Sequence, residues 1–179
     1  HRERRGRELA DGDDRTDQRQ RRDDGVHTRA VGQTGIDHGA DFVDPADIEA
    51  GVAVNPHLPL VPGSSWVYEG EEETVTVTVT GEIKEILGVP CAVVRDVVEE
   101  DGELVEDTYD WFAQDLEGNV WYFGEIARNY EDGELVDLEG SWTAGKDGAK
   151  IGVLMPIDPQ PGAVYRQEFL LGEAEDMAE

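Results

Sequence analysis

A run of strict valine–threonine alternation, ETVTVTVTG at residues 73–81, constrains the fold of this chain more than any other segment. Successive side chains of a β-strand point to opposite faces, so Val75, Val77 and Val79 share one face and the threonines share the other. β-Branched residues also favour strands over helices. The segment therefore predicts a half-buried strand with one apolar face and one wet face.

Glycine-bearing turns follow this strand and divide the chain into further extended runs. Asp-Gly between two such runs is a strong hairpin signal, because a type I′ turn needs positive φ at both central residues. A second strand is predicted over residues 89–100, after a turn at Leu87-Gly88. The other predicted turns lie at 101–102, 117–119 and 132–133, and the other strands near 103–113, 120–130, 134–142, 150–154 and 164–170.

These runs predict an all-β fold of about seven or eight strands joined by tight turns. Sequential hairpins give an antiparallel meander, and long strands in a meander twist and coil strongly. We therefore expect the sheet to curl into a barrel or half-barrel around a core or cavity.

The chain divides into three parts by composition. Residues 1–43 are rich in Arg, Asp and Gly, and we expect them to be disordered because they offer little apolar surface to bury. A misassigned reading frame in a GC-rich gene gives such a composition too, so a non-native tail is an alternative. Residues 44–64 are expected to form a short helical turn and a Pro-rich lead-in, with Asp44 as N-cap, and residues 65–179 the β domain.

Charge excludes one class of partner. The net charge is −27, and all of it falls on residues 41–179, because nine Arg balance nine acids in residues 1–40. Such a body repels phosphate backbones and anionic membranes, so we expect no nucleic acid partner. The sequence also contains no apolar run long enough to span a bilayer.

Cysteine and histidine are too scarce for a metal site or a nucleophilic triad. Cys91 is the single cysteine and lies in an apolar strand, so a buried, unreactive thiol is expected. His57 is the single histidine after residue 40, and a surface position is expected for it. The glycines serve turns and form no phosphate-binding loop, so we expect no metal and no cofactor.

Four segments of the body carry a resemblance to known sequences: NPHLPLVPGSSWVYEG, VVRDVVEEDGELVEDTYDWFAQDLEGNVWYFGE, EGSWTAGKDGA and YRQEFLLGEAEDMAE. The block from Val93 to Glu125 is the most specific. By these segments the chain resembles an uncharacterised family of secreted or lipid-anchored bacterial β-rich proteins. It implies export to the cell envelope or beyond, and it implies no activity. Residues 1–40 differ from the leader and spacer usual in such proteins. Similar proteins continue into more strands after the position of Glu179, so the resemblance implies a truncated sheet with an unpaired edge.

The hairpin DWFAQDLEGNVWYFGE, residues 110–125, holds the candidate site residues. A two-residue loop at Glu117-Gly118 would place Phe112 opposite Phe123 and Asp110 opposite Glu125. One face would then carry Asp110, Phe112, Trp121, Phe123 and Glu125, and the other Tyr109, Trp111, Ala113 and Tyr122. A four-residue loop over 115–118 would separate the two carboxylates. Facing carboxylates in a cavity are a candidate acid/base pair, whereas on an open face they are solvated charge.

Three functions are compatible with this sequence. The leading hypothesis is a non-enzymatic exported β domain that binds a small apolar or amphiphilic ligand, or a protein partner, in the concavity of the sheet. Its candidate ligand-binding residues are Trp66, Trp111, Trp121, Tyr122 and Phe123. The alternatives are a small β-barrel enzyme that uses Asp110 and Glu125, and a structural surface module with a filled interior.

Overall fold

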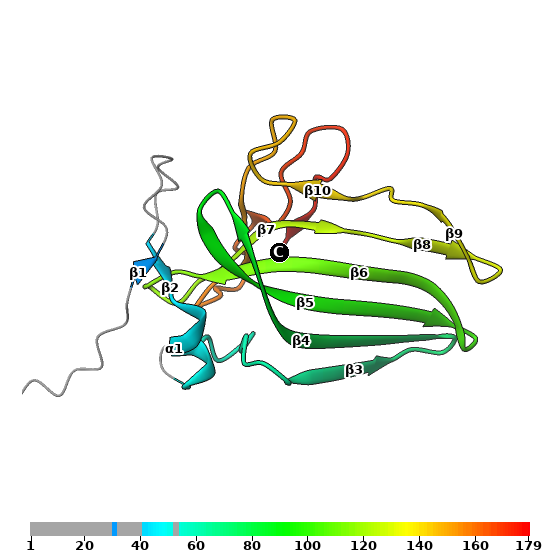
Figure 1. The fold of residues 1–179 in the computed structure, drawn as a ribbon, viewed down its shortest axis with the longest axis horizontal. Coiled ribbons are helices and arrows are strands. Elements are labelled where there is room, and N and C mark those ends of the chain that lie inside the picture. Colours follow the sequence, from blue (N-terminus) through cyan, green and yellow to red (C-terminus); the bar gives the residue numbers. More distant parts are fainter. Residues whose placement is uncertain (1–29, 32–40, 52–53) are drawn as a thin grey trace, which may run out of the picture.

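The computed structural model describes residues 30–31, 41–51 and 54–179, and its centre is one antiparallel sheet (Figure 1). Hairpins join successive strands of the sheet from β3 to β7, as the glycine-bearing turns predict. The path of the sheet is β10 (Trp142–Thr143), β7 (Val120–Ile126), β6 (Glu103–Gln114), β5 (Val89–Glu100), β4 (Glu73–Ile86) and β3 (Ser65–Glu69).

Shorter elements surround this path. β11 (Gly152–Met155) also pairs with β7, while β8 (Asn129–Glu131) pairs with β6 and with β9 (Glu134–Asp137). Two separate pairs are β1 (Ala30–Val31) with β2 (Phe42–Val43), and β12 (Tyr165–Arg166) with β13 (Met177–Ala178). The helix α1 (Pro45–Glu49) lies with β1 and β2 at one end of the sheet (Figure 1). It is far too short to cross a membrane, and the described residues contain no longer helix.

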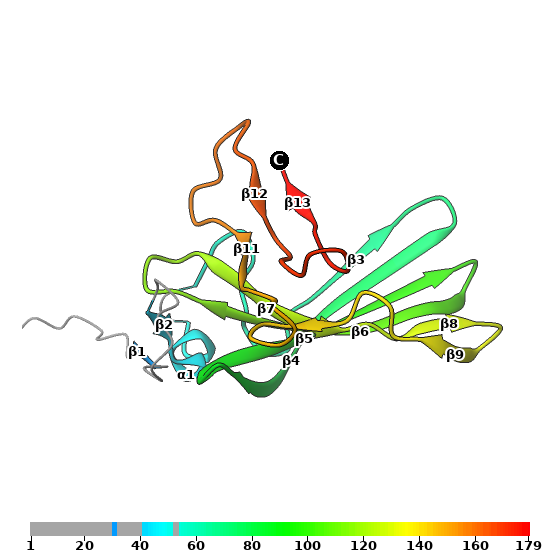
Figure 2. The same cartoon turned by 90° about the horizontal axis from the view of Figure 1, so that it is seen from above.

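The predicted all-β antiparallel fold is confirmed, in its half-barrel form. β3 and β10 end the sheet without pairing with each other, so the sheet does not close into a barrel. Figure 2 shows the strands curving toward the side on which β12 and β13 stand. We call this the concave face, and the other the opposite face.

Positive φ angles explain where the hairpins turn. Leu87, Asp101 and Asp132 have φ of 52°, 51° and 52°, and each precedes a glycine that also has positive φ. These are the two-residue turns that the sequence predicts, because type I′ geometry needs both residues in the left-handed region. β4 contains an irregularity between Val79 and Ile83, where Gly81 has φ 82°.

The lead-in and helix are held against the sheet by a buried core and one asparagine. Asp44 caps α1 by accepting a 3.0 Å hydrogen bond from the Ala46 amide, as predicted. The Asn55 amide donates to Gln114 Oε1 at 2.7 Å, and Asn55 Nδ2 donates to the Gly118 carbonyl at 2.8 Å. Asn55 is fully buried, so these bonds fix the start of the lead-in to the hairpin loop.

The structure describes only part of the region around the expected boundary at residue 44. Disorder is expected for residues 1–43, but residues 1–29 and 32–40 lie outside the described residues. Phe42 and Val43 precede the expected boundary at residue 44, yet they are buried, and Phe42 packs edge-on against Phe123 at 5.3 Å between ring centroids. The strand expected near 164–170 is limited to Tyr165–Arg166.

Candidate functional site

The loop of the Asp110–Glu125 hairpin has neither of the two expected lengths. Gln114 pairs with Val120, and the Asp115 amide donates to the Asn119 carbonyl at 2.9 Å, which leaves residues 116–118 as a three-residue loop. A β-bulge then shifts the register by one residue between Asp110 and Phe112. Asp110 therefore faces Glu125, as predicted from a two-residue loop, although the loop itself is longer.

The bulge changes which side chains share a face. Phe112 pairs with Tyr122, not with Phe123, and their ring centroids lie 4.8 Å apart. Trp121 pairs with Ala113 and so lies on the opposite face. The predicted assignment of Trp121 to the face of Asp110, and of Tyr122 to the face of Trp111, is therefore wrong.

Gly124 lies on β7 within the stretch where the register shifts. It has φ 127°, and a Cβ at this position would lie 2.3 Å from the Trp142 carbonyl oxygen. Only glycine allows β10 to approach β7 this closely. β10 then aligns Trp142 with Glu125, so a row of facing residues crosses five strands on the concave face: Val79, Val94, Asp110, Glu125 and Trp142.

Asp110 is the buried centre of this row. Its exposed fraction is 7%, and the Tyr122 hydroxyl donates a 2.5 Å hydrogen bond to its Oδ1. Burial raises the pKa of Asp110 to about 7, and the bond from Tyr122 opposes the rise only in part. Asp110 thus titrates near neutral pH.

Glu125 meets a carboxyl group from a distant part of the chain. Its side chain is hydrogen-bonded to Glu168, between β12 and β13. Burial is the main cause that raises the pKa of Glu125, and the negative charge of Asp110 adds to it. The pKa of Glu168 is also raised, by burial and then by Asp176. We call Asp110, Glu125 and Glu168 the carboxyl cluster.

Two further acids extend the negative charge of the concave face. Burial raises the pKa of Asp96 to about 6, with a contribution from Glu106. Asp96 lies on β5 and Glu106 on β6. Across the described residues, however, no group of three or more His, Cys, Asp or Glu side chains has an arrangement that could hold a metal ion.

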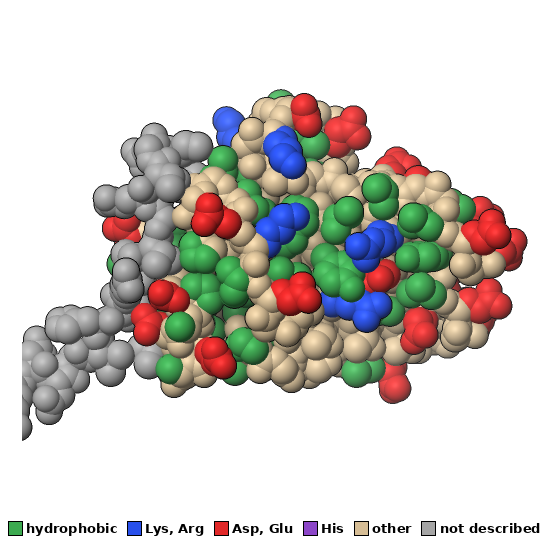
Figure 3. Space-filling view, in the orientation of Figure 1, with side chains coloured by type: hydrophobic (Ala, Val, Ile, Leu, Met, Phe, Trp, Pro, Cys, Tyr) green, Lys and Arg blue, Asp and Glu red, His purple; other side chains and the backbone are tan. Residues whose placement is uncertain are grey.

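The opposite face carries cations that lie over aromatic rings. Lys84 Nζ lies 3.3 Å from the centroid of the Trp111 ring. Arg95 and Arg128 lie over Tyr109, at 5.7 and 4.8 Å, and both also pair with Asp107. Including Lys150 and Arg166 over Phe169, five of the six Lys and Arg of residues 41–179 lie over a ring. In the space-filling view, Lys and Arg side chains lie among hydrophobic ones over the central strands (Figure 3).

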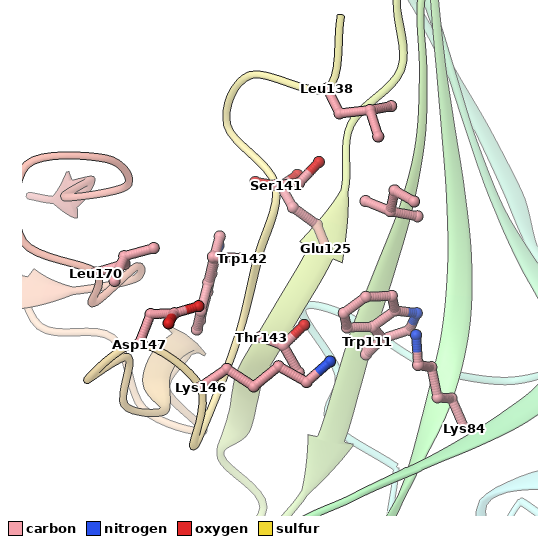
Figure 4. A pocket seen from close by; sticks show the side chains of 11 residues that line it. Lys84, Trp111, Glu125, Leu138, Ser141, Trp142, Thr143, Lys146, Asp147 and Leu170 are labelled. Carbon is pink, nitrogen blue, oxygen red and sulfur yellow. The ribbon is translucent and has the colours of Figure 1, made fainter.

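A pocket of about 310 Å³ lies beside the Lys84–Trp111 pair (Figure 4). The tip of the β4–β5 hairpin packs against the loop that follows β10. Leu87 lies so close to Gly145 that a Cβ added to this glycine would be 2.5 Å from Leu87 Cδ2. Lys84 and Lys146 extend toward Trp111 from two sides of the pocket (Figure 4). The other lining residues are Glu125, Ile126, Leu138, Ser141, Trp142, Thr143, Asp147 and Leu170.

Trp111 is the one predicted ligand-binding residue that lines this pocket. Trp66 lies half-buried on the concave face, opposite Val77. Trp121 is half-buried and donates from Nε1 to Asp115 at 2.7 Å. Tyr122 and Phe123 are buried, and Phe123 is fully enclosed in the core. A ligand could reach Phe123 only if the core opened.

Sequence reasoning missed Lys84, Lys146, Trp142 and Glu168. Lys84 carries a detectable signal, since it is a single cation within the acidic stretch GEIKEI of a predicted strand. Glu168 has none, because 43 residues separate it from Glu125 and nothing local predicts their contact. The comparisons with known proteins add no functional residue: no family model, curated protein or solved structure matches the chain.

Proposed function

We propose that this chain is a non-enzymatic binding domain whose pocket takes a small amphiphilic anion. The acid group of the ligand lies between Lys84 and Lys146, and its apolar body lies along Trp111, Ile126 and Leu138. One observation carries the proposal: two lysines converge on a tryptophan in a pocket, and neither forms an ion pair with any described residue.

The electrostatics of the pocket support an anionic ligand. Residues 41–179 contain 33 acids, yet neither pocket lysine lies within ion-pair distance of a carboxylate in the part of the chain that the structure describes. The pKa of Lys84 is lowered, first by desolvation and then by repulsion from Lys146. A bound carboxylate or sulfonate would offset both effects, because an opposite charge nearby favours the ammonium form. The volume also suits a small ligand.

The pocket also limits the chemical class of the expected ligand. A purely apolar ligand would leave both ammonium groups without a partner, whereas an amphiphilic one uses the lysines and the ring together. Export to the cell envelope or beyond, which the family resemblance implies, remains part of the proposal. Fractionation of cells that express the native gene tests it, and a purely cytoplasmic product would contradict it.

Decanoate and decanol test the binding proposal, because they share a chain length and differ in charge. We expect calorimetry to detect decanoate and to show much weaker binding of decanol. Lys84→Met and Lys146→Met should each weaken decanoate binding by about tenfold, the cost of one charge-assisted contact. Lys150→Met is the matched control, since Lys150 lies over Phe169 and does not line the pocket.

Two results would overturn the binding proposal. The first is that decanoate does not bind, or that it binds no more tightly than decanol. The other is an equal loss of affinity in Lys150→Met and in the two pocket variants, because the lysines would then act only through net charge. A protein that binds neither compound would agree with the structural surface module instead.

An acid/base enzyme is the second candidate, and the facing of Asp110 and Glu125 favours it. The two groups share the concave face, and neither lies in open solvent. Asp110 is 7% exposed, however, and Glu168 binds Glu125, so a substrate has poor access to the pair. A turnover screen over esters and glycosides tests this candidate, and activity that survives Asp110→Asn would exclude it.

A further inference from the structure

The C-terminal segment, defined here as residues 156–179, lies on the concave face with few backbone contacts to the sheet. Gln167 Nε2 donates to the Leu154 carbonyl at 3.2 Å, and the Lys150 amide donates to the Phe169 carbonyl at 2.9 Å. A Cβ at Gly152 would lie 2.0 Å from the Gln167 carbonyl oxygen, so the segment passes directly over β11. Figure 2 shows β12 and β13 standing away from the sheet on that side.

Glu168 connects this segment to the carboxyl cluster. It meets Glu125 of β7, which faces Asp110 of β6, so three carboxyl groups from three parts of the chain converge. The titratable groups around them are Asp96 from β5, Glu106 from β6, Tyr122 from β7 and Asp176 from the segment. The cations of this region, Lys150 and Arg166, lie over Phe169.

Trp142 supplies an independent observation at the same place. Its side chain is 3% exposed, and its buried Nε1 has no partner at hydrogen-bonding distance among the residues that the structure describes. It lies near enough to Glu168 to lower the pKa of that carboxyl. A buried N–H group near Glu168 favours the carboxylate form of that residue, which is the form expected when the proton resides on Glu125.

We infer that a proton shared by Glu125 and Glu168 fastens the C-terminal segment to the sheet, and that loss of this proton releases the segment. When Glu125 is protonated, it donates to the Glu168 carboxylate. When the proton leaves to solvent, carboxylates of Asp110, Glu125 and Glu168 face one another at a largely buried site, and their repulsion opposes contact. Segment release therefore follows rising pH.

The same segment contributes one residue to the lining of the pocket. Leu170 lines the pocket two residues after Glu168, so release of the segment removes the contribution of Leu170. We call the proton-dependent contact between Glu125 and Glu168 the latch. The latch would then regulate the binding of the amphiphilic anion, and this consequence rests on the proposed function. The latch itself depends only on the contact between the segment and the sheet.

Hydrogen exchange tests the latch without any ligand. The amides of residues 165–176 are compared with those of β5 in the same molecule, so that the pH dependence of the chemical exchange rate cancels. Between pH about 6 and pH about 9, we expect the segment to lose at least about tenfold in protection relative to β5. An unchanged ratio over this range would overturn the inference.

Substitutions separate the latch from general alkaline loosening. Glu125→Gln and Glu168→Gln each remove a titrating carboxyl while keeping an amide that can bond its partner, so the segment should stay protected at high pH. Glu173→Gln is the matched control, because Glu173 is exposed on the same segment, and it should behave as the native chain does. Loss of protection in all three variants alike would also overturn the inference.

Decanoate binding, measured alongside, distinguishes the two proposals. A segment that releases with pH in a chain that binds no decanoate leaves the latch standing and refutes the proposed function. If decanoate binding requires Lys84 and Lys146 but the protection of the segment does not change with pH, the proposed function stands and the latch is refuted. If both proposals hold, Lys84→Met weakens decanoate binding and leaves the hydrogen exchange of the segment unchanged.

Discussion

Tyr122 donates a 2.5 Å hydrogen bond to Asp110 beneath the C-terminal segment, and both side chains are nearly inaccessible to solvent. The bond stabilises the ionised form of a carboxyl that burial otherwise drives toward neutrality. Tyr122 therefore limits the rise in the pKa of Asp110 that burial causes, while Glu125 and Glu168 continue the cluster toward the pocket.

Tyr122→Phe should raise the pKa of Asp110 above its value of about 7, because the donor that opposes the rise is removed. We also expect a loss of about 1–2 kcal/mol in the free energy of unfolding at neutral pH. Carboxyl-carbon NMR measures the pKa, and urea titration measures the stability. Tyr68→Phe is the control: Tyr68 is 59% exposed, and its removal should change stability by less than about 0.5 kcal/mol. Equal effects of both substitutions would contradict the assigned role of Tyr122.

Asp110→Asn should reduce the fall in stability as pH rises. The pKa of Asp110 is raised from 3.8 to about 7, so the folded chain holds this proton more tightly than the unfolded chain does. Its contribution to stability is full below pH about 4 and is lost as pH rises toward about 7. Urea titrations across this range should therefore show a shallower decline in the variant. Asp158→Asn, at an exposed site, is the control, and its stability should depend on pH as that of the native chain does. If Asp110→Asn also shows the native pH dependence, the carboxyl of Asp110 does not titrate in this range and the prediction is wrong.

Gly124→Ala should destabilise the fold far more than Gly133→Ala. Both glycines have positive φ, of 127° and 77°, so both substitutions carry a conformational cost of about 1 kcal/mol. Only at Gly124 does the new Cβ also clash with backbone, at 2.3 Å from the Trp142 carbonyl oxygen, whereas Gly133 has open space around it. Thermal unfolding of the two variants measures the difference, and equal melting temperatures would show that β10 can move away from β7 at little cost.

Cys91 should not react with thiol reagents in the native state. It is fully buried, as the sequence predicts, and burial raises its pKa well above the ordinary value. Labelling with an aromatic disulfide at pH about 8 should be slow in buffer and rapid in denaturant. Rapid labelling of the native protein would mean that the β4–β5 hairpin opens on the timescale of the reaction.

The sequence predicts the strands and turns of this fold well because their causes are local. Valine–threonine alternation specifies β4, and Asp-Gly pairs specify two of the hairpins, since each depends on neighbouring residues only. The same reasoning gives β5 its bounds, Val89–Glu100. It does not predict that β3 and β10 stay apart, because closure depends on the combined curvature of all the strands.

The candidate site was predicted less completely, since its contacts are non-local. The facing of Asp110 and Glu125 was correct, but it arises from a three-residue loop followed by a bulge. Gly124, an isolated glycine within a strand pattern, is the signal that would have indicated the bulge. The contact of Glu168 with Glu125 and the approach of Lys146 to Trp111 depend on how the last third of the chain returns to the sheet, and no local pattern encodes that path.

Aromatic rings hold most of the positive charge of this body, since five of its six basic side chains lie over Trp111, Tyr109 or Phe169. Dissolved ions screen the mutual repulsion of exposed carboxylates, but they weaken short contacts between a cation and a ring much less. We therefore expect added salt to relieve more repulsion in this molecule than it removes attraction, so that the free energy of unfolding rises with ionic strength, whereas in a protein held by surface ion pairs it would fall.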